Sequence, residues 1–274
     1  MLGAIVGDIV GSTRENLRIK RKDFELFPES SDYTDDTVLT VAVADAILSG
    51  KSYAETIKSY GKRDPLRGYG PRFMSWLFSP GIAPYNSFGN GSAMRVSPVA
   101  HAFDSQDSVL LNARKSAECT HNHPEGIKGA QATALAIYMA RSGADKEEIR
   151  NRIKSRFGYD LDRTVDSIRP NYQFDITCPG SVPEAIIAFL DSTDFEDAIR
   201  NAVSLGGDAD TQAAIAGSIA EAYYKDIPSP MLEKAWRKLP TVFRDVIIEF
   251  ASRYGNPEVP DELRLDIGSK LNHT

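Results

Sequence analysis

Cysteine and histidine are scarce in this sequence. Its 274 residues contain four histidines and two cysteines, Cys119 and Cys178, which are far apart and outside any CxxC pair. A disulfide framework or a structural zinc site needs more of these residues at closer spacing, so neither is expected. The scarcity of cysteine fits a reducing compartment, and we expect a cytoplasmic protein.

Long apolar stretches are also lacking. No stretch approaches the roughly 20 residues that a membrane-spanning helix needs. The apolar N-terminal stretch 2–10 is interrupted by Asp8 and lacks the basic residues that precede the core of a signal peptide. We therefore expect no membrane partner.

Positive charge is not in excess. Lysine and arginine total 32 against 38 aspartates and glutamates, which gives a formal net charge of −6. Proteins that bind nucleic acids usually carry a basic face, so no nucleic-acid partner is expected. A short basic cluster at 18–22 is followed by Asp23 and Glu25 and is typical of a solvated surface turn.

Alternating strand patterns are nearly absent, whereas helical patterns recur along the chain. Two long stretches, 60–95 and 158–181, are rich in proline and glycine and are either functional loops or an irregular cover. Pro240 is expected to divide the last helical segment. We predict one all-α domain over residues 1–274. The predicted helical segments are 38–48, 127–140, 146–157, 182–190, 195–205, 213–224 and 231–254.

Two acidic clusters each precede a buried helix. The first is YTDDT at 33–37 and the second is GGDADT at 206–211. One interpretation is helix capping, because threonine is a good N-cap and aspartate complements the helix dipole. The other is a shared site. If the two helix starts converge, four carboxylates carry a charge that two divalent cations would balance, and ligands that are all oxygen favour Mg²⁺ or Mn²⁺ over zinc.

Glycines mark two further features. The loop NSFGNGS at 86–92 would let backbone N–H groups approach an anion such as a diphosphate, although Asn-Gly is also common in ordinary turns. Gly3, Gly7 and Gly11 are spaced four apart, which suits a close contact between helices and does not match the GxGxxG order of a dinucleotide fold. Asp8, between them, is interpreted as a buried structural carboxylate.

The chain resembles the ADP-ribosylglycohydrolase family, which includes the dinitrogenase reductase-activating glycohydrolases. The resemblance runs from Gly3 to about Tyr224 and rests on motifs in the family's order. They are Gly7-Asp8 with Gly11 and Glu15, TDDT at 34–37, GNGSAMR at 89–95, Thr120-His121 before an alanine-rich helix, and GGDADT at 206–211. Ala209 stands where threonine is common, but this position is not an expected ligand. Glu221 and Lys225 stand where glycines are common, which weakens the transfer of substrate preference more than the transfer of chemistry.

The resemblance implies an orthogonal helical bundle with a binuclear Mg²⁺ or Mn²⁺ centre. The implied metal ligands are Thr34, Asp35, Asp36, Asp208, Asp210 and Thr211. Of these, Asp36 or Asp35 would deprotonate the attacking water, and Glu15 would contact the substrate above the metals. The implied substrate-binding residues are Ser87, Phe88, Gly89, Asn90, Gly91 and His121. The Phe88 ring would stack on adenine, and Arg95 would either contact a phosphate or form a structural ion pair.

The expected activity is metal-dependent hydrolysis of the glycosidic bond between ADP-ribose and a modified protein side chain. One alternative is a hydrolase of a small-molecule ADP-ribose conjugate. Another is a relative that binds ADP-ribose without catalysis, which the presence of every acidic ligand disfavours. The linkage that is cleaved, the choice between Mg²⁺ and Mn²⁺, and the oligomeric state do not follow from the sequence.

Overall fold

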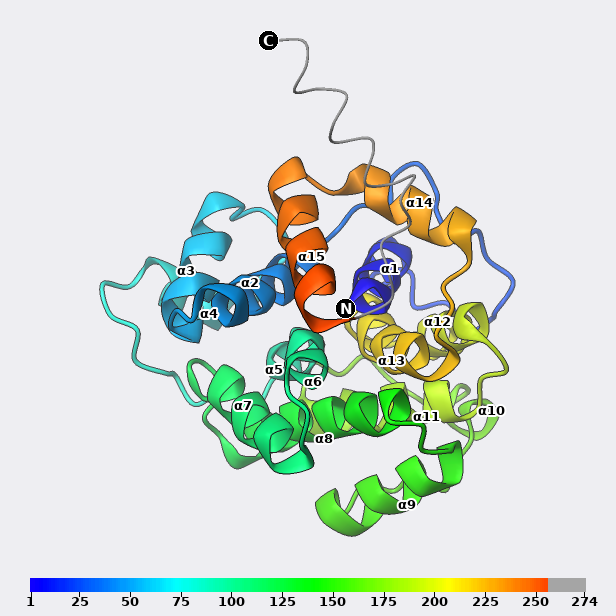
Figure 1. Cartoon of the computed structure of the whole chain (residues 1–274). Coiled ribbons are helices and arrows are strands. Elements are labelled where there is room, and N and C mark those ends of the chain that lie inside the picture. Colours follow the sequence, from blue (N-terminus) through cyan, green and yellow to red (C-terminus); the bar gives the residue numbers. More distant parts are fainter. Residues whose placement is uncertain (256–274) are drawn as a thin grey trace.

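The computed structural model describes residues 1–255, which form helices joined by loops (Figure 1). Within this range there is no strand, and an isolated β-bridge pairs Gly89 with Thr177. The prediction of an all-α fold is confirmed. The helices are α1 (Leu2–Gly11), α2 (Asp35–Ser49), α3 (Tyr53–Arg63), α4 (Pro71–Phe78), α5 (Gly91–Met94), α6 (Ser97–Ala102), α7 (Gln106–Glu118), α8 (Pro124–Arg141), α9 (Lys146–Phe157), α10 (Val165–Ile168), α11 (Cys178–Leu190), α12 (Phe195–Ser204), α13 (Ala209–Tyr224), α14 (Ser229–Lys238) and α15 (Thr241–Tyr254).

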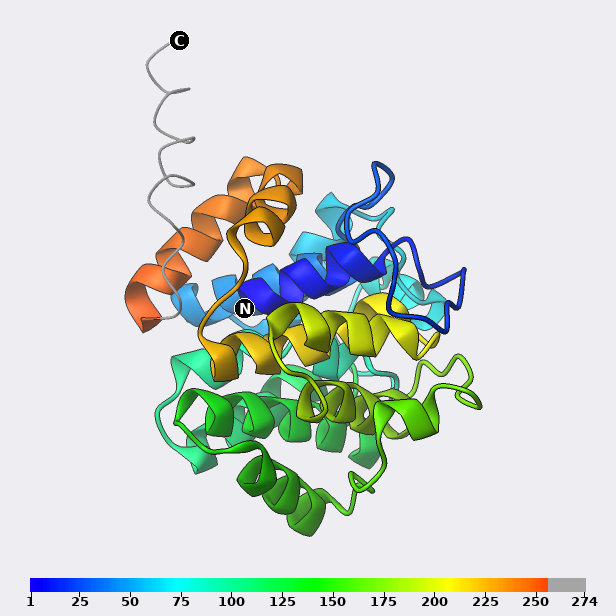
Figure 2. The ribbon, with the colours of Figure 1, turned by 90° about the vertical axis from the view of Figure 1, so that its right-hand side faces the viewer.

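Helices α1 and α13 form a tightly packed central pair (Figure 2). They run antiparallel, because Gly3 of α1 faces Gly217 of α13 while Gly7 faces Ala213. A methyl group on Gly7 would lie 2.1 Å from the carbonyl oxygen of Ala213, so the two backbones touch. The four-residue spacing of the glycines therefore marks a close helix contact, as the sequence predicts.

Glu221 holds the start of α1 against the end of α13. Its carboxylate accepts hydrogen bonds from the backbone N–H groups of Leu2 at 3.2 Å and Gly3 at 2.9 Å, and it pairs with the amino group of Met1. These are backbone donors that a helix start leaves without an intrahelical partner. Glu221 thus acts as a cap that a neighbouring helix supplies to α1.

The helix boundaries differ from the sequence prediction mainly in the proline- and glycine-rich stretches. Residues 60–95 contain α4 and α5, and 158–181 contain α10 and the start of α11. Pro71 stands at the start of α4, where the missing N–H of proline is tolerated, so this proline begins a helix. Helices α3, α6 and α7 are also absent from the predicted segments. Pro240 separates α14 from α15, which confirms that prediction.

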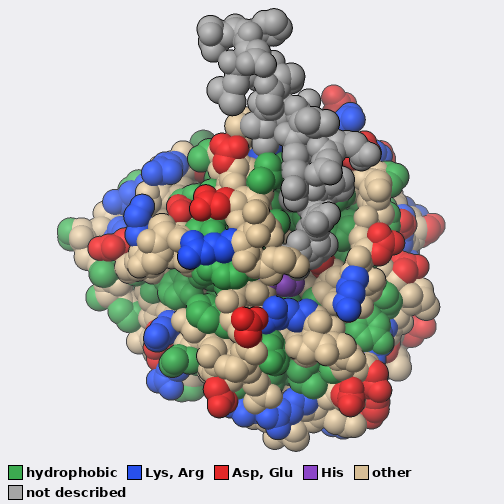
Figure 3. Space-filling model, in the orientation of Figure 1, with side chains coloured by type: hydrophobic (Ala, Val, Ile, Leu, Met, Phe, Trp, Pro, Cys, Tyr) green, Lys and Arg blue, Asp and Glu red, His purple; other side chains and the backbone are tan. Residues whose placement is uncertain are grey.

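Charged side chains of both signs are interspersed on the face shown in Figure 3. In the basic turn at 18–22, the exposed Arg18 lies over the ring of Phe174, and Lys22 pairs with Asp197. Among the helices of residues 1–255, none is long and apolar enough to cross a membrane.

Candidate functional site

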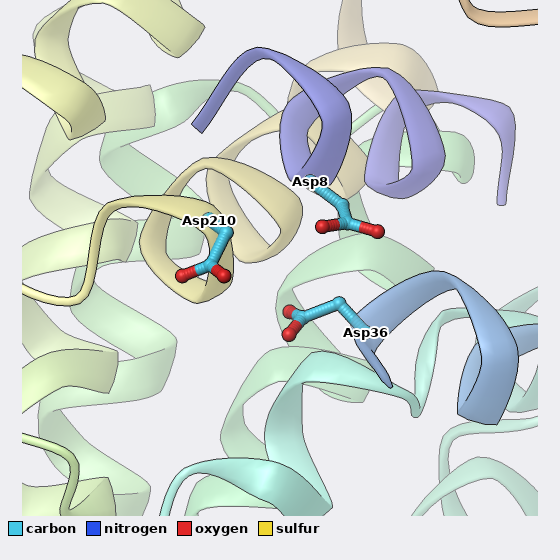
Figure 4. A group of neighbouring side chains, drawn as sticks. All are labelled: Asp8, Asp36 and Asp210. Carbon is cyan, nitrogen blue, oxygen red and sulfur yellow. The ribbon is translucent and has the colours of Figure 1, made fainter. Parts of the chain in front are cut away.

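Three carboxylates from three helices converge at one point. Asp8 comes from α1, Asp36 from the start of α2 and Asp210 from the start of α13, and Figure 4 shows them pointing toward one another. Each offers an oxygen that lies within 4.8 Å of the other two. All three side chains are buried, with relative exposures of 0%, 3% and 6%. Segments far apart in the sequence therefore share one acidic centre.

Asp8 fixes the start of α2. Its Oδ1 accepts a hydrogen bond from the Thr34 hydroxyl at 2.7 Å, and its Oδ2 accepts from the backbone N–H groups of Thr34 and Thr37 at 3.0 and 3.1 Å. The Thr34 hydroxyl in turn accepts from the N–H of Asp36 and is the N-cap of α2. Since the hydroxyl proton goes to Asp8, the remaining lone pair of the Thr34 oxygen could face a cation.

Capping does not account for the second acidic cluster. Asp208 occupies the N-cap position of α13, yet its side chain makes no capping hydrogen bond. Its Oδ2 instead accepts a hydrogen bond from the side-chain amide of Asn90 at 2.6 Å. Asp210 accepts from the N–H of Thr211, and the Thr211 hydroxyl donates to Asp36 at 3.2 Å. The side chains at this helix start therefore point into the shared centre.

The charge of the acidic centre has no cationic neighbour in residues 1–255. The ion pairs of this part of the chain involve other carboxylates, and the buried Oδ1 of Asp36 has no hydrogen-bond partner there. An isolated buried carboxylate is costly unless it is protonated or coordinates a metal. An all-oxygen set of donors with uncompensated negative charge fits a hard divalent cation.

The pKa values of the carboxyl groups respond to this crowding. Burial raises the pKa of Asp8 to about 7, with a further contribution from the charge of Asp210. Burial also raises the pKa of Asp36 well above its usual value. The neighbours whose charges add to the rise at Asp36 are Asp210, Asp8, Asp35 and Asp208. The pKa values of Asp35 and Asp208 are raised in the same way, first by burial and then by Asp210.

The metal-free protein is expected to lose stability as the pH rises. An aspartate titrates near pH 3.9 in an unfolded chain, whereas burial raises the pKa of Asp8 to about 7 in the folded protein. The folded state therefore binds more protons between these values, so the contribution of the cluster to stability is present at low pH and is lost as the pH rises through about 4 to 7. The melting temperature, measured in the presence of a chelator, should fall by several degrees as the pH is raised from about 4 to 7.

Mg²⁺ or Mn²⁺ should weaken this pH dependence, because a cation takes the place of the protons. The matched melts with saturating metal are the control. Equal downward shifts with and without metal would show that the raised pKa values of the acidic centre are unrelated to cation binding.

Glu15 lies on the segment that follows α1. It is half-buried, and its pKa is raised by burial and then by the charge of Asp210. The structure thus places Glu15 within the electrostatic reach of the acidic centre. Thr34 and Asp35 are partly buried, and the charges of Asp210, Asp8 and Glu15 act on Asp35, so these side chains lie near one another.

The glycine-rich loop lies beside the acidic centre. It is held by the bridge between Gly89 and Thr177, and the backbone N–H of Asn90 donates to the carbonyl of Ile176 at 2.8 Å. The Asn90 side chain reaches Asp208. This one residue therefore joins the loop to the acidic centre.

The remaining predicted substrate residues flank this loop. Phe88 is 43% exposed, and its ring lies 5.2 Å from that of His123. The N–H of Ser87 donates to the carbonyl of Thr120, which places the loop against the segment that carries His121. His121 is buried, and a methyl group on Gly91 would lie 3.2 Å from its Nε2.

Two residues have a place in the structure that the sequence did not reveal. Asp8, interpreted as structural, is indeed buried, but it also offers an oxygen within 4.8 Å of Asp36 and Asp210 and so belongs to the group of carboxylates that could hold a cation. A single carboxylate in an otherwise apolar helix was the available signal. Arg95 is fully buried and forms no ion pair within residues 1–255; it donates to the carbonyl of Ser116 and to the hydroxyl of Thr120.

Comparisons with known proteins agree on one family. ADP-ribosylhydrolase ARH3 of Homo sapiens is 29% identical, over 82% of this chain and 84% of its own length. ADP-ribosylarginine hydrolase Tri1 of Pseudomonas putida is 28% identical, over 86% of this chain and 73% of its own. A solved structure described as an ADP-ribosylglycohydrolase-related protein complex matches with a TM-score of 0.70 and 26% identity, covering 93% of this chain and 97% of that one. Residues 1–262 match the family profile of the ADP-ribosylglycohydrolases, and the chain is a member of that family.

Proposed function

We propose that this protein hydrolyses the glycosidic bond between ADP-ribose and a modified protein side chain, with two divalent cations, Mg²⁺ or Mn²⁺, in the acidic centre. The observation that carries the proposal is the hydrogen bond between Asn90 and Asp208, which joins a glycine-rich loop to a cluster of carboxylates. A loop suited to a diphosphate thereby lies next to a site suited to sugar hydroxyls and cations.

The residues proposed to hold the cations all supply oxygen. They are Thr34, Asp35, Asp36, Asp208, Asp210 and Thr211. When bound, divalent cations orient hydroxyl groups and lower the pKa of water. Asp8 keeps the Thr34 hydroxyl oriented through the bond of 2.7 Å, as an outer carboxylate commonly does at metal sites.

Each remaining residue has a proposed part in binding or proton transfer. Cleavage at the anomeric carbon passes through an oxocarbenium-like state, and a base must take a proton from the attacking water. We assign that proton to Asp36 or Asp35, and the buried Oδ1 of Asp36 has no hydrogen-bond partner in residues 1–255. Glu15 is half-buried, and its pKa is raised by burial and then by the charge of Asp210. We assign to it the role of orienting the substrate above the cations.

The proposed substrate-binding residues surround the glycine-rich loop. The backbone N–H of Gly91, at the start of α5, would approach the diphosphate, and Ser87 and Gly89, whose N–H groups donate within the protein, would border it. Asn90 would hold the loop in place. Phe88 and His121 would contact the adenine and the ADP-ribose. A cytoplasmic location, with neither nucleic acid nor membrane as partner, completes the proposal.

The type of linkage is tested by a release assay. Purified protein would be incubated with proteins ADP-ribosylated on arginine or serine and with small ADP-ribose conjugates, each with Mg²⁺, Mn²⁺ or a chelator. The proposal expects metal-dependent release of ADP-ribose from a modified protein. The relative from Pseudomonas putida is an ADP-ribosylarginine hydrolase, so arginine is the first linkage to try. Release only from small conjugates would favour the small-molecule alternative. Binding of ADP-ribose without any release would favour a non-catalytic relative.

Phe88→Ala is expected to weaken the binding of ADP-ribose by roughly 1–3 kcal/mol, the usual range for stacking of a base on an aromatic ring. The exposure of 43% leaves the ring accessible to a ligand. Because the side chain is not in the core, the melting temperature should hardly change. Calorimetric titration with ADP-ribose measures the effect, and an unchanged affinity would show that the ring does not contact adenine.

A further inference from the structure

Arg95 and Thr120 form a chain of contacts that ends on His121. Arg95 Nη2 donates to the Thr120 hydroxyl oxygen at 2.8 Å, and this oxygen lies 2.7 Å from Nδ1 of His121. All three side chains are buried, with exposures of 0% for Arg95, 0% for Thr120 and 5% for His121. Arg95 has no surface for a ligand to contact, so it can affect binding only through its neighbours.

The hydrogen bonds between Arg95, Thr120 and His121 have a preferred direction. A guanidinium can only donate, so the Thr120 oxygen must accept from Arg95. If the Thr120 hydroxyl then donates to Nδ1 of His121, the hydroxyl proton and the Nδ1 lone pair are both satisfied. The reverse order would aim two N–H groups at one hydroxyl oxygen and would need another acceptor for its proton, such as the sulfur of Cys119.

The charge of Arg95 favours the same order. Its Nε and Nη1 are buried and have no hydrogen-bond partner within residues 1–255, so the positive charge beside His121 is not neutralised there. A lone pair on Nδ1 is stabilised by this charge, whereas an N–H at the same place is not. Burial lowers the pKa of His121 well below its usual value, and the charges of Arg95 and Arg72 lower it further.

We propose that Arg95 and Thr120 are positioning residues that fix His121 as the neutral tautomer with its proton on Nε2, so that Nε2–H is presented as a hydrogen-bond donor to the substrate. The direction of Nε2 supports this. Methyl groups placed on Gly91 and Gly89 would lie 3.2 and 3.6 Å from Nε2, so this nitrogen faces the glycine-rich loop. The inference rests on the proposed function, in which that loop holds a diphosphate, whose oxygens only accept hydrogen bonds.

The tautomer can be measured without any substrate. The full chain, loaded with Mg²⁺, would be labelled with ¹⁵N-histidine, and the signals of its four histidines would be assigned by loss of one set in His121→Ala. Correlations between ring protons and nitrogens distinguish a protonated Nε2 from a protonated Nδ1. A neutral His121 with its proton on Nε2 is expected. A proton on Nδ1, or a doubly protonated ring at neutral pH, would overturn the proposal.

Binding of ADP-ribose tests the positioning role. Thr120→Val keeps the shape of the side chain and removes the hydroxyl, and it should weaken binding by about 10-fold, the effect of losing a hydrogen bond to a charged group. Thr120→Ser should restore most of the affinity. In the His121→Ala background, Thr120→Val should add little, since the two residues act as one unit. An equal loss in both backgrounds would show that Thr120 supports the fold and does not act through His121.

Turnover gives an independent readout. His121 faces the loop, so Thr120→Val should mainly raise KM and leave kcat largely unchanged. A failure of the proposed function is distinguishable from a failure of this inference. If the protein binds ADP-ribose through His121 but releases none from any conjugate, the proposed hydrolysis is wrong, whereas the proposed role of Arg95 and Thr120 is unaffected. If it binds no ADP-ribose, the tautomer measurement alone decides.

Discussion

Replacing Asp210 with asparagine is expected to remove most of the activity and most of the stabilisation that Mg²⁺ or Mn²⁺ gives to the fold. Asparagine keeps the shape of the side chain and can still accept the hydrogen bond that the N–H of Thr211 donates to Asp210 at 2.9 Å. It lacks the negative charge that a divalent cation requires. Since changes in the outer shell of a metal site already cost roughly 10–100-fold, the loss of activity should be about 100-fold or more.

The same substitution should raise the melting temperature of the metal-free protein. The charge of Asp210 raises the pKa values of Asp36 and Asp208, so the carboxylates repel one another when no cation is bound. Removing one charge relieves that repulsion. With metal, the wild-type protein gains stability by mass action and the variant gains little. The order of the two melting temperatures should therefore reverse when Mg²⁺ or Mn²⁺ is titrated in.

Asp194→Asn is the matched control. Asp194 is the N-cap of α12, and its side chain accepts a hydrogen bond from the N–H of Asp197 at 2.8 Å. Asparagine caps a helix as well as aspartate does, so activity and the metal-dependent melting shift should both stay unchanged. If Asp210→Asn behaved like this control, Asp210 would be an ordinary helix residue and the proposed metal site would lose its second cluster.

The starts of α2 and α13 could be predicted from the sequence because their signals are local. Thr34 followed by two aspartates is such a signal, and the structure has Thr34 as the N-cap of α2. Pro240 as the break between α14 and α15 is another. Local patterns also indicated that the helices behind both acidic clusters are buried, since their residues are apolar on every side.

The geometry of the site depends on contacts between distant segments, which local patterns do not encode. Thr211 and Asp36 are 175 residues apart and share a hydrogen bond, and the bridge between Gly89 and Thr177 holds the glycine-rich loop. The sequence offered both clusters as candidates for one site, but only packing decides which oxygens converge. For the same reason the burial of Arg95, and its contact with Thr120, could not be read from the motif that contains it.

The contact between α1 and α13 connects the fold to the acidic centre. Asp8 follows Gly7 on α1, and Asp210 lies one turn before Ala213 on α13. The distance between the two carboxylates is therefore set by how closely the two helices approach. Because the glycines allow backbone to touch backbone, α1 brings Asp8 within 4.8 Å of Asp36 and Asp210.

Gly7→Ala is accordingly expected to reduce both stability and metal affinity. The added methyl group would lie 2.1 Å from the carbonyl oxygen of Ala213 and 2.7 Å from the backbone nitrogen of Ala214, and backbone atoms cannot rotate away as a side chain would. Overpacking of this kind costs about 1–3 kcal/mol or more, because the helices must separate. Urea unfolding would give the loss of stability, and calorimetric titration with Mg²⁺ at a temperature where the variant is folded would give the loss of affinity.

Gly81→Ala separates this effect from a general effect of losing a glycine. A methyl group on Gly81 would have the backbone nitrogen of Ala83 at 4.0 Å as its nearest neighbour, so stability and Mg²⁺ binding should stay close to those of the wild type. A Gly7→Ala protein that is less stable but binds Mg²⁺ normally would show that Asp8 does not need the close helix contact. Wild-type stability in Gly7→Ala would mean that the backbones of α1 and α13 do not touch at Gly7. Only the loss of both properties, in Gly7→Ala and not in Gly81→Ala, agrees with a site whose geometry is set by the packing of these two helices.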